Sequence, residues 1–175
     1  GYRLGSNGEY YNSDLGLEKI KKYADIYGLT ELSGVEIVES EPQVSSEDAV
    51  RSAIGQGNHN YTTVGLSRYI TTVANSGVCY NLTLIDKMTD HNGNLLEDNT
   101  AEIRNIIEME SSYWDAIHLG MRRVAESKQY FNIGVDVAGK TGTAQQSSSH
   151  PNHALFVSYA PYDAPEISVT VRIVN

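Results

Sequence analysis

A lysine and two threonines stand among glycines in the sequence Gly-Val-Asp-Val-Ala-Gly-Lys-Thr-Gly-Thr-Ala-Gln, which covers residues 134–145. Its first eight residues match the pattern G-x-x-x-x-G-K-[ST], in which backbone N–H groups and the lysine bind the phosphates of a nucleotide. The same residues are also typical of an edge strand that presents Lys140 and the hydroxyls of Thr141 and Thr143 to a ligand. The two hypotheses place the lysine on different elements, before a helix in the first and within a strand in the second.

The residues on either side of the lysine indicate which element fits better. A phosphate-binding loop needs a helix that opens at the Lys-Thr pair, so that its N-terminal N–H groups face the phosphates. The residues from Gly142 to Pro151 have no apolar spacing that would bury one face of a helix, and Val135 and Val137 favour extended backbone. The local sequence therefore favours the strand, and a nucleotide hydrolase remains the alternative function.

Cysteine and histidine offer little further chemistry. Cys79 is the single cysteine, so an intrachain disulfide is impossible, and such a residue is most often a small buried one. His118 lies beside the apolar face of an expected helix and is interpreted as a packed side chain. His150 and His153 are three residues apart but have no cysteine, carboxylate or helix beside them, so we expect no metal site and no cofactor.

The composition indicates one globular domain with a marked negative charge. The chain has 175 residues, of which 40% are hydrophobic and 20% are charged, as in ordinary globular domains. No apolar run approaches the roughly 20 residues of a membrane-spanning helix. The formal charge of −9, from 22 acidic and 13 basic residues, opposes binding to nucleic acid. We therefore expect neither a membrane span in this chain nor a nucleic-acid partner.

Helices are expected where apolar residues recur at steps of three and four, or where a capping residue precedes a short run. The expected helices run from Asp14 to Gly28, from Ser45 to Ile54, from Thr63 to Asn75 and from Ser112 to Val124. Asp14 and Ser45 are the expected capping residues of the first two. Residues 29–44 are predicted to form a long loop with at most one short strand, at Gly34-Val35-Glu36-Ile37.

Strands are expected in two regions. Residues 78–84 alternate between apolar and polar, and Asn92-Gly93 predicts a hairpin back into Leu95-Leu96, which together indicate a peripheral β-ribbon. Residues 131–145, 153–160 and 167–173 are three successive strands with short connections, which is typical of an antiparallel meander. The expected fold class is α+β, an antiparallel sheet that ends in this meander and carries packed helices.

The order of short motifs along the chain resembles that in a known family. The motifs are Gly34-Val35-Glu36-Ile37, Ile54-Gly55-Gln56-Gly57, Ala74-Asn75-Ser76-Gly77, Gly120-Met121, Ala138 to Gln145, Asn152-His153-Ala154-Leu155-Phe156 and Tyr159-Ala160-Pro161. Together, over roughly residues 15–175, they resemble the second half of the transpeptidase domain of class B penicillin-binding proteins. The resemblance implies an α/β scaffold shared with serine β-lactamases and the catalytic motifs Ser-x-x-Lys, Ser-x-Asn and Lys-Thr-Gly.

Only the third of these motifs, Lys140-Thr141-Gly142, occurs in this sequence. Residues 1–175 are therefore expected to be a single partial transpeptidase domain, without the segments that carry the other two motifs and without the family's C-terminal helix. Because the nucleophile and general base are missing, the chain alone is expected to be inactive. A domain cut in this way is also expected to expose apolar surface and to self-associate. A non-catalytic binding or scaffold module is the other alternative, which the missing serine would suit.

The resemblance also implies a reaction, a substrate and a location. The parent protein would cross-link peptidoglycan stem peptides ending in D-Ala-D-Ala by serine acyl transfer, and β-lactams would bind at the same atoms. Lys140, Thr141 and Thr143 would bind the substrate's terminal carboxylate, Gly142 would let the peptide lie close, and the Thr143 N–H would be one oxyanion-hole donor. Other cell-wall synthesis proteins are possible partners. The parent would lie at the extracytoplasmic face of the bacterial cell membrane, anchored by an N-terminal segment outside this chain.

Overall fold

Three antiparallel strands in the order β7-β8-β9 form the main sheet: β7 (Ala138–Ala144), β8 (His153–Ala160) and β9 (Ile167–Ile173). The computed structural model describes residues 2–5, 8–127, 133–144 and 152–174. Within those ranges β7 pairs only with β8, so its other edge is open. The predicted meander is confirmed, although β7 is shorter than the expected strand over residues 131–145.

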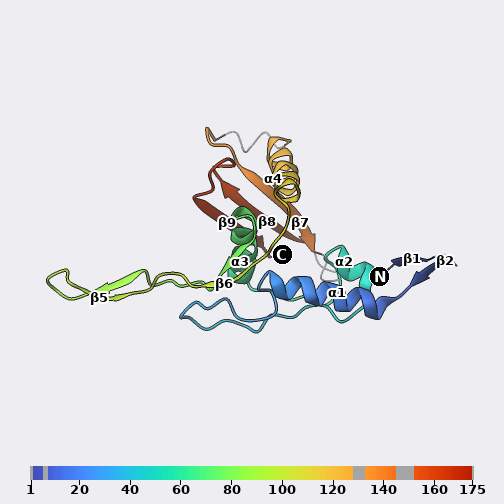
Figure 1. Ribbon diagram of the computed structural model, residues 1–175, viewed down its shortest axis with the longest axis horizontal. Helices are drawn as coiled ribbons and strands as arrows, with labels where there is room; N and C mark the ends of the chain where they lie inside the picture. Colours follow the sequence, from blue (N-terminus) through green and yellow to red (C-terminus); the bar gives the residue numbers. More distant parts are fainter. Residues whose placement is uncertain (1, 6–7, 128–132, 145–151, 175) are drawn as a thin grey trace.

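Two helices cover one face of this sheet, α3 (Thr63–Ala74) and α4 (Ser111–Glu126) (Figure 1). Their apolar faces meet the sheet in one buried cluster, which consists of Ile70, Val73, Met121, Ala138 and Tyr159. Thr71 on α3 also shares a hydrogen bond with Ser168 on β9, with 2.9 Å between their hydroxyl oxygens. The spacing of apolar residues predicted both helices because their inward positions recur at helical steps. Ile117 on α4 is 37% exposed.

The N-terminal part contains a two-stranded hairpin, β1 (Tyr2–Gly5) and β2 (Gly8–Tyr11), and two helices, α1 (Ser13–Ile26) and α2 (Ala49–Ala53). Both helices were predicted, but the expected capping residues were wrong. Asn12 caps α1 by accepting a hydrogen bond from the Leu15 N–H, and Asp48 caps α2 in the same way. The Ser45 hydroxyl instead bonds to Asn58 and Ser52. In both cases a nearby residue of equal capping preference is placed better.

The segment between α1 and α2 is a long loop, as predicted, and it is attached to α3 by a buried arginine. The Arg68 side chain is 1% exposed. Its guanidinium donates hydrogen bonds to the carbonyl groups of Gly28, Ser33 and Glu31. Gly34 to Ile37 form no strand. A single antiparallel bridge between Gln43 and Asn60 adds backbone pairing near the end of the loop. The loop is therefore held largely by side-chain donors, which a pattern of apolar residues does not reveal.

Four short strands follow α3: β3 (Val78–Tyr80), β4 (Lys87–Thr89), β5 (Leu95–Asp98) and β6 (Ile103–Ile106). β4 pairs with β5 around Asn92-Gly93, so the predicted hairpin is confirmed, and it projects away from the sheet (Figure 1). The expected strand over residues 78–84 is too long, because β3 ends at Tyr80 and the Leu82 N–H donates to the Ser33 carbonyl. Its partner β6 was not predicted. No helix in the described ranges is long and apolar enough to cross a membrane.

Candidate functional site

The four residues that the sequence singled out lie next to one another in the middle of β7. Lys140, Thr141 and Thr143 are exposed and Gly142 is half-buried. Because side chains alternate along a strand, Lys140 and Gly142 point to one face of the sheet and the two threonines to the other. A ligand that lies along the open edge of β7 can therefore contact the side chains of both faces and the backbone between them.

The Lys140 ammonium group has no acidic partner in the part of the chain that the structure describes. Its Nζ donates a hydrogen bond to the carbonyl of Thr141 over 2.6 Å, and no ion pair involves it. A lysine in this state carries an unneutralised positive charge at the sheet edge. It is suited to an anionic ligand group such as a carboxylate.

The phosphate-loop hypothesis is wrong for this lysine. Lys140 and Thr141 are the third and fourth residues of β7, and the strand continues to Ala144. The helix N-terminus that would present N–H groups to a phosphate does not follow Lys140 in the described part of the chain. Residues 145–151 lie outside the described ranges. The pattern of glycine, lysine and threonine is present, but pairing with β8 sets the backbone of this segment as a strand.

The start of β7 is fixed by an arginine that the sequence analysis did not identify. Arg122 on α4 donates a hydrogen bond to the Val137 carbonyl over 3.2 Å and forms an ion pair with Asp136. The Asp136 carbonyl in turn accepts a hydrogen bond from the Tyr162 N–H over 2.8 Å. These contacts hold the residues just before Ala138 against α4 and the β8–β9 turn. In the sequence, the one indication of these contacts was the isolated Asp136 just before the strand.

Both glycines of β7 serve packing within the sheet. A Cβ atom on Gly139 would lie 2.5 Å from Phe156 Cζ, so the aromatic ring covers the glycine backbone. A Cβ atom on Gly142 would lie 3.3 Å from Leu155 Cβ, which is tighter than an ordinary contact. From the sequence, Gly142 is expected to let a peptide lie close to the strand. The neighbouring β8 side chains are a second reason, which concerns the fold.

A cavity of about 490 Å³ is lined by residues of β8 and β9 and by the segment that follows α2. Leu155, the pairing partner of Gly142, and Arg172, the pairing partner of Leu155, line one side of it. The turn Gly55-Gln56-Gly57 and the segment from His59 to Tyr61 line the other. The sequence identified this turn only as a tight one. The tertiary structure brings it into the lining of a space of ligand size, together with Leu155 and Arg172.

His59 holds the far wall of this cavity in place. Its Nδ1 accepts a hydrogen bond from the Ser45 N–H over 3.0 Å, and its Nε2 lies 3.1 Å from the Ser52 carbonyl oxygen. Since a carbonyl can only accept, Nε2 is the nitrogen that donates to Ser52. The Tyr61 hydroxyl oxygen also lies within hydrogen-bond distance of the His59 Nδ1, at 3.0 Å. Burial raises the pKa of the Tyr61 hydroxyl to about 12.

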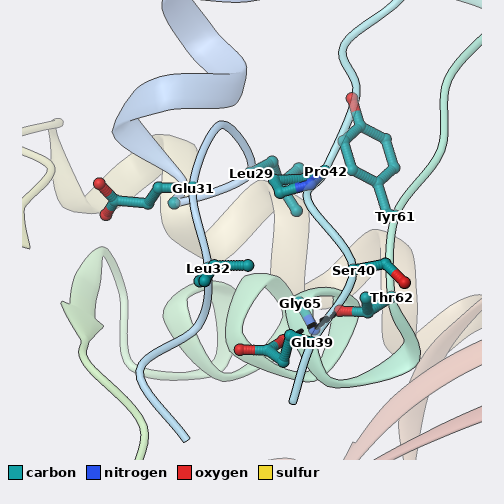
Figure 2. Close-up of a pocket in the computed structure, with 10 residues that line it drawn as sticks. Leu29, Glu31, Leu32, Glu39, Ser40, Pro42, Tyr61, Thr62 and Gly65 are labelled. Carbon is teal, nitrogen blue, oxygen red and sulfur yellow. Dashed lines mark hydrogen bonds between the residues drawn. The ribbon is translucent and has the colours of Figure 1, made fainter.

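A second hollow beneath the loop is too small for a ligand. Figure 2 shows its lining, in which Glu39 lies between the loop and the first turn of α3. Its volume is about 10 Å³, which is the space of about one water molecule. One carboxylate oxygen of Glu39 accepts hydrogen bonds from the Ser33 N–H and hydroxyl, and the other accepts one from the Thr62 hydroxyl. This hollow is part of the attachment of the loop to α3.

The remaining candidate residues take structural roles. Cys79 is fully buried, which confirms the interpretation from sequence. His118 Nε2 lies 2.7 Å from the Val73 carbonyl oxygen, and the ring packs against Trp114 and Tyr159, so the packed histidine is also confirmed. His153 is buried at the start of β8, whereas His150 lies outside the described residues. No group of three or more metal-binding side chains is found in the described ranges.

Comparison with known proteins identifies the family that this arrangement matches. The model of the penicillin binding protein transpeptidase domain matches residues 9–175. Penicillin-binding protein 2A of Bacillus subtilis is 33% identical over 139 residues, which cover 69% of this chain and 19% of that protein. Penicillin-binding protein 2B of Streptococcus pneumoniae is 26% identical over 181 residues, which cover 91% of this chain and 26% of that protein.

Solved structures agree with the sequence comparisons. A structure of penicillin-binding protein 2B from Streptococcus pneumoniae strain R6 matches with a TM-score of 0.77 and 27% identity, and covers 93% of this chain and 30% of that one. The penicillin G acyl-enzyme complex of penicillin-binding protein A from M. tuberculosis matches with a TM-score of 0.75 at 21% identity, covers 92% of this chain and 39% of that one, and so supports the fold. The chain spans less than a third of the curated relatives named here.

Proposed function

This chain belongs to the transpeptidase domain family of class B penicillin-binding proteins, and from that membership we propose that the full-length protein cross-links peptidoglycan stem peptides by serine acyl transfer. Relatives named as peptidoglycan D,D-transpeptidases, from Haemophilus influenzae and Mycolicibacterium smegmatis, support this activity. The observation that carries the proposal is the Lys-Thr-Gly sequence in the open edge strand of a sheet that matches this family. A nucleotide hydrolase has no such support.

The proposed reaction needs a nucleophile that residues 1–175 do not contain. A serine hydroxyl attacks the carbonyl carbon of the penultimate D-alanine, the terminal D-alanine leaves, and an amine from a second stem peptide attacks the resulting ester. No serine in this sequence is followed by a lysine three residues later. We therefore place the nucleophile and its base outside this sequence and assign recognition of the substrate to β7. The chain alone should form no acyl-enzyme.

We assign three interactions with the substrate to β7. The unneutralised ammonium group of Lys140 and the hydroxyls of Thr141 and Thr143 bind the terminal carboxylate of the stem peptide, through charge-assisted hydrogen bonds. The open edge of β7 pairs with the extended peptide backbone, as in other cases of strand addition. Gly142 between the threonines keeps that approach free of a side chain.

The backbone N–H of Thr143 is the proposed oxyanion-hole donor of this chain. A second donor would come from the residue that carries the nucleophile. Preorganised N–H groups stabilise the negative oxygen of the tetrahedral intermediate, and removal of one donor typically lowers the rate by about 10²–10³. The donor is a backbone N–H, so what matters is where the strand holds it and not which side chain residue 143 carries. Pairing of β7 with β8 fixes the position of the strand.

β-Lactams are the second proposed class of ligand. Structures of M. tuberculosis penicillin-binding protein A are described as acyl-enzyme complexes with imipenem and with penicillin G. A β-lactam carries a carboxylate next to its reactive amide, so Lys140, Thr141 and Thr143 would contact it as they contact the stem peptide. For the full-length protein we also propose a location at the extracytoplasmic face of the cell membrane and contacts with other cell-wall synthesis proteins.

The proposal can be tested by labelling with a fluorescent penicillin. The full-length protein encoded by the parent gene should gain one covalent adduct by intact mass spectrometry, and tandem mass spectrometry of its peptides should locate the adduct on a serine outside residues 1–175. The 175-residue chain alone should keep its mass. An adduct on the isolated chain would show that a nucleophile had been overlooked in it. A full-length protein that forms no adduct and has no Ser-x-x-Lys would favour the non-catalytic scaffold module.

A further inference from the structure

The hairpin of β4 and β5 extends from the body of the molecule as a two-stranded ribbon (Figure 1). We call residues 84–98 the ribbon. Every residue of β4 and β5 is exposed, and neither strand pairs with a third strand in the described ranges. Two-stranded hairpins are marginally stable in water unless something packs against them. The acyl-transfer function proposed above gives this element no role.

The ribbon exposes apolar side chains at its base and on both of its strands. Leu84, Met88, Leu95 and Leu96 are 63%, 43%, 56% and 68% exposed. Ile85 beside them is also exposed. Single exposed apolar residues are ordinary, but five of them on one projecting element are typical of a binding surface.

The ribbon is also more acidic than the rest of the chain. It carries Asp86, Asp90, Glu97 and Asp98 against a single lysine, Lys87. With histidine neutral, its formal charge is −3, a third of the −9 of the whole chain on about a twelfth of the residues. None of these carboxylates forms an ion pair with a described residue. Their charge is therefore available to a partner.

A cavity at the base of the ribbon gathers two of these carboxylates. It has a volume of about 370 Å³, and Asp86, Asp98 and Leu84 are part of its lining. Two acidic groups beside a leucine suit the side chain of a lysine or arginine, which has an apolar stem and a cationic end. Negative charge and apolar surface, which both occur along the ribbon, therefore lie side by side in this cavity.

The ribbon is attached at its base and has a hydrogen-bonded turn at its tip, so it can present this surface in a defined geometry. At its base, Glu36 accepts hydrogen bonds from the Leu84 N–H over 2.9 Å and from the Thr83 hydroxyl. These hydrogen bonds lower the pKa of the Glu36 carboxyl. At its tip, Asp90 accepts hydrogen bonds from the N–H groups of Asn92 and Asn94, each over 2.8 Å.

We propose that the ribbon is the docking site for a basic segment of a partner protein, in which lysine or arginine side chains alternate with apolar ones. The basic side chains would contact Asp86 and Asp98, and the apolar ones would pack on Leu84 and Leu96. An open strand edge also allows the segment to pair as an additional strand. Anionic membrane surfaces and nucleic acids would be repelled by the same carboxylates. A second copy would bring like charges together.

The test uses a fluorescein-labelled peptide of twelve alternating lysine and valine residues and measures its fluorescence anisotropy with the 175-residue chain at 150 mM salt. The double variant Asp86→Asn with Asp98→Asn should raise Kd at least tenfold. The matched control is Glu18→Gln with Glu47→Gln, which removes two exposed carboxylates elsewhere and should change Kd less than twofold. Leu84→Ser with Leu96→Ser should also weaken binding. Circular dichroism melting curves check that all variants fold.

Four outcomes would overturn the proposal. Equal weakening in the Glu18 and Glu47 control would mean that the peptide follows net charge alone. Equal affinity for a peptide of alternating lysine and serine would mean that the apolar side chains take no part. Binding of the chain to phosphatidylglycerol vesicles, lost in Leu84→Ser with Leu96→Ser, would mean that the ribbon contacts membranes. A dimer in light scattering that the same variant abolishes would mean that it binds a second copy.

Discussion

At the scale of single residues, the free positive charge of Lys140 decides what β7 can bind. Its ammonium group contacts only the carbonyl of the next residue, so a ligand carboxylate can take it over without breaking an ion pair among the described residues. A charge-assisted hydrogen bond contributes roughly 1.5–3 kcal/mol, about twice an ordinary one. The lysine is exposed, so its removal leaves the core intact.

Changing Lys140→Ala in the full-length protein should therefore lower the second-order rate of acylation by penicillin about 10- to 100-fold. The free energy of unfolding should change by no more than about 0.5 kcal/mol, as is usual for exposed positions. Stopped-flow or gel-based labelling measures the rate. Lys87→Ala, which removes the same charge from the ribbon, is the matched control and should acylate normally. Equal loss in both variants would contradict a specific role for Lys140.

Tyr159, at the centre of the core, has a buried hydroxyl group whose pKa affects the stability of the fold. The residue is 1% exposed, and its hydroxyl has no hydrogen-bond partner among the described residues. Burial, with a smaller contribution from Tyr162, raises the pKa of Tyr159 to about 12. Because the pKa is higher in the folded state than in the unfolded chain, folding is stabilised at and below pH 10. That stabilisation is lost as the pH rises from about 10 towards 12.

Tyr159→Phe should leave the free energy of unfolding unchanged or raise it by about 1 kcal/mol, since it removes a buried hydroxyl without a partner. The decline of stability between pH 10 and 12 should also be shallower in this variant, by up to roughly 2–3 kcal/mol for a shift of two units. Urea unfolding at several pH values measures both effects. Tyr159→Ala, which leaves a cavity, should cost about 3–5 kcal/mol. A large loss in Tyr159→Phe would mean that the hydroxyl has a partner.

At the scale of elements, the turn between α3 and β3 shows how closely the chain is packed. Gly77 has a positive φ of 102°. A Cβ atom there would lie 2.6 Å from the Ile107 carbonyl oxygen and 2.8 Å from Trp114 Cζ2. The Ile107 N–H also donates to the Gly77 carbonyl over 2.9 Å, which joins this turn to the end of β6. The glycine is therefore required both by its backbone conformation and by its neighbours.

Gly77→Ala should destabilise the chain by more than about 3 kcal/mol, because neither the backbone oxygen nor the indole can move away easily. Gly93→Ala provides the matched control, since Gly93 also has a positive φ, of 85°, but has no atom within 4 Å of the added Cβ. It should cost only the roughly 1–2 kcal/mol of the backbone conformation. Thermal unfolding followed by circular dichroism compares them. Equal losses would show that close packing at Gly77 contributes nothing.

At the scale of the whole molecule, one face of the main sheet is uncovered by any described element. Helices α3 and α4 pack on the opposite face. Ile167, Val169, Val171 and Ile173 alternate along β9 with the residues that face α3, and their exposed fractions are 61%, 45%, 42% and 57%. This is an apolar stripe on a sheet surface. The sequence predicts that the isolated chain self-associates, and this stripe is the surface through which we expect it to do so.

Multi-angle light scattering of the isolated chain should show a mass that rises with concentration. Val169→Lys with Val171→Lys should shift the mass towards that of a monomer, because two charges on the stripe oppose its burial. Val38→Lys with Val50→Lys changes the net charge equally at two exposed positions outside β9 and should leave association unchanged. A wild-type chain that stays monomeric at high concentration would contradict the prediction.

The sequence by itself determined the elements whose formation depends on local pattern. Helical spacing predicted α1, α3 and α4, alternation predicted β9, and Asn92-Gly93 predicted the ribbon. The Lys-Thr-Gly residues could be assigned to a strand because the residues after them cannot form an apolar helix face. These features are set within about ten residues of the chain, so neighbouring residues suffice to specify them.

Only the tertiary structure decided the contacts between distant segments. Arg68 is an ordinary helix residue in the sequence, yet it is buried under a loop about forty positions away, where it donates to three carbonyl groups. The pairing of β3 with β6, the Phe156 ring over Gly139 and the cavity lined by both Gln56 and Leu155 likewise join segments that are far apart along the chain. Their stability comes from burial and hydrogen bonding across the fold, and a local pattern carries no information about which segment will lie opposite.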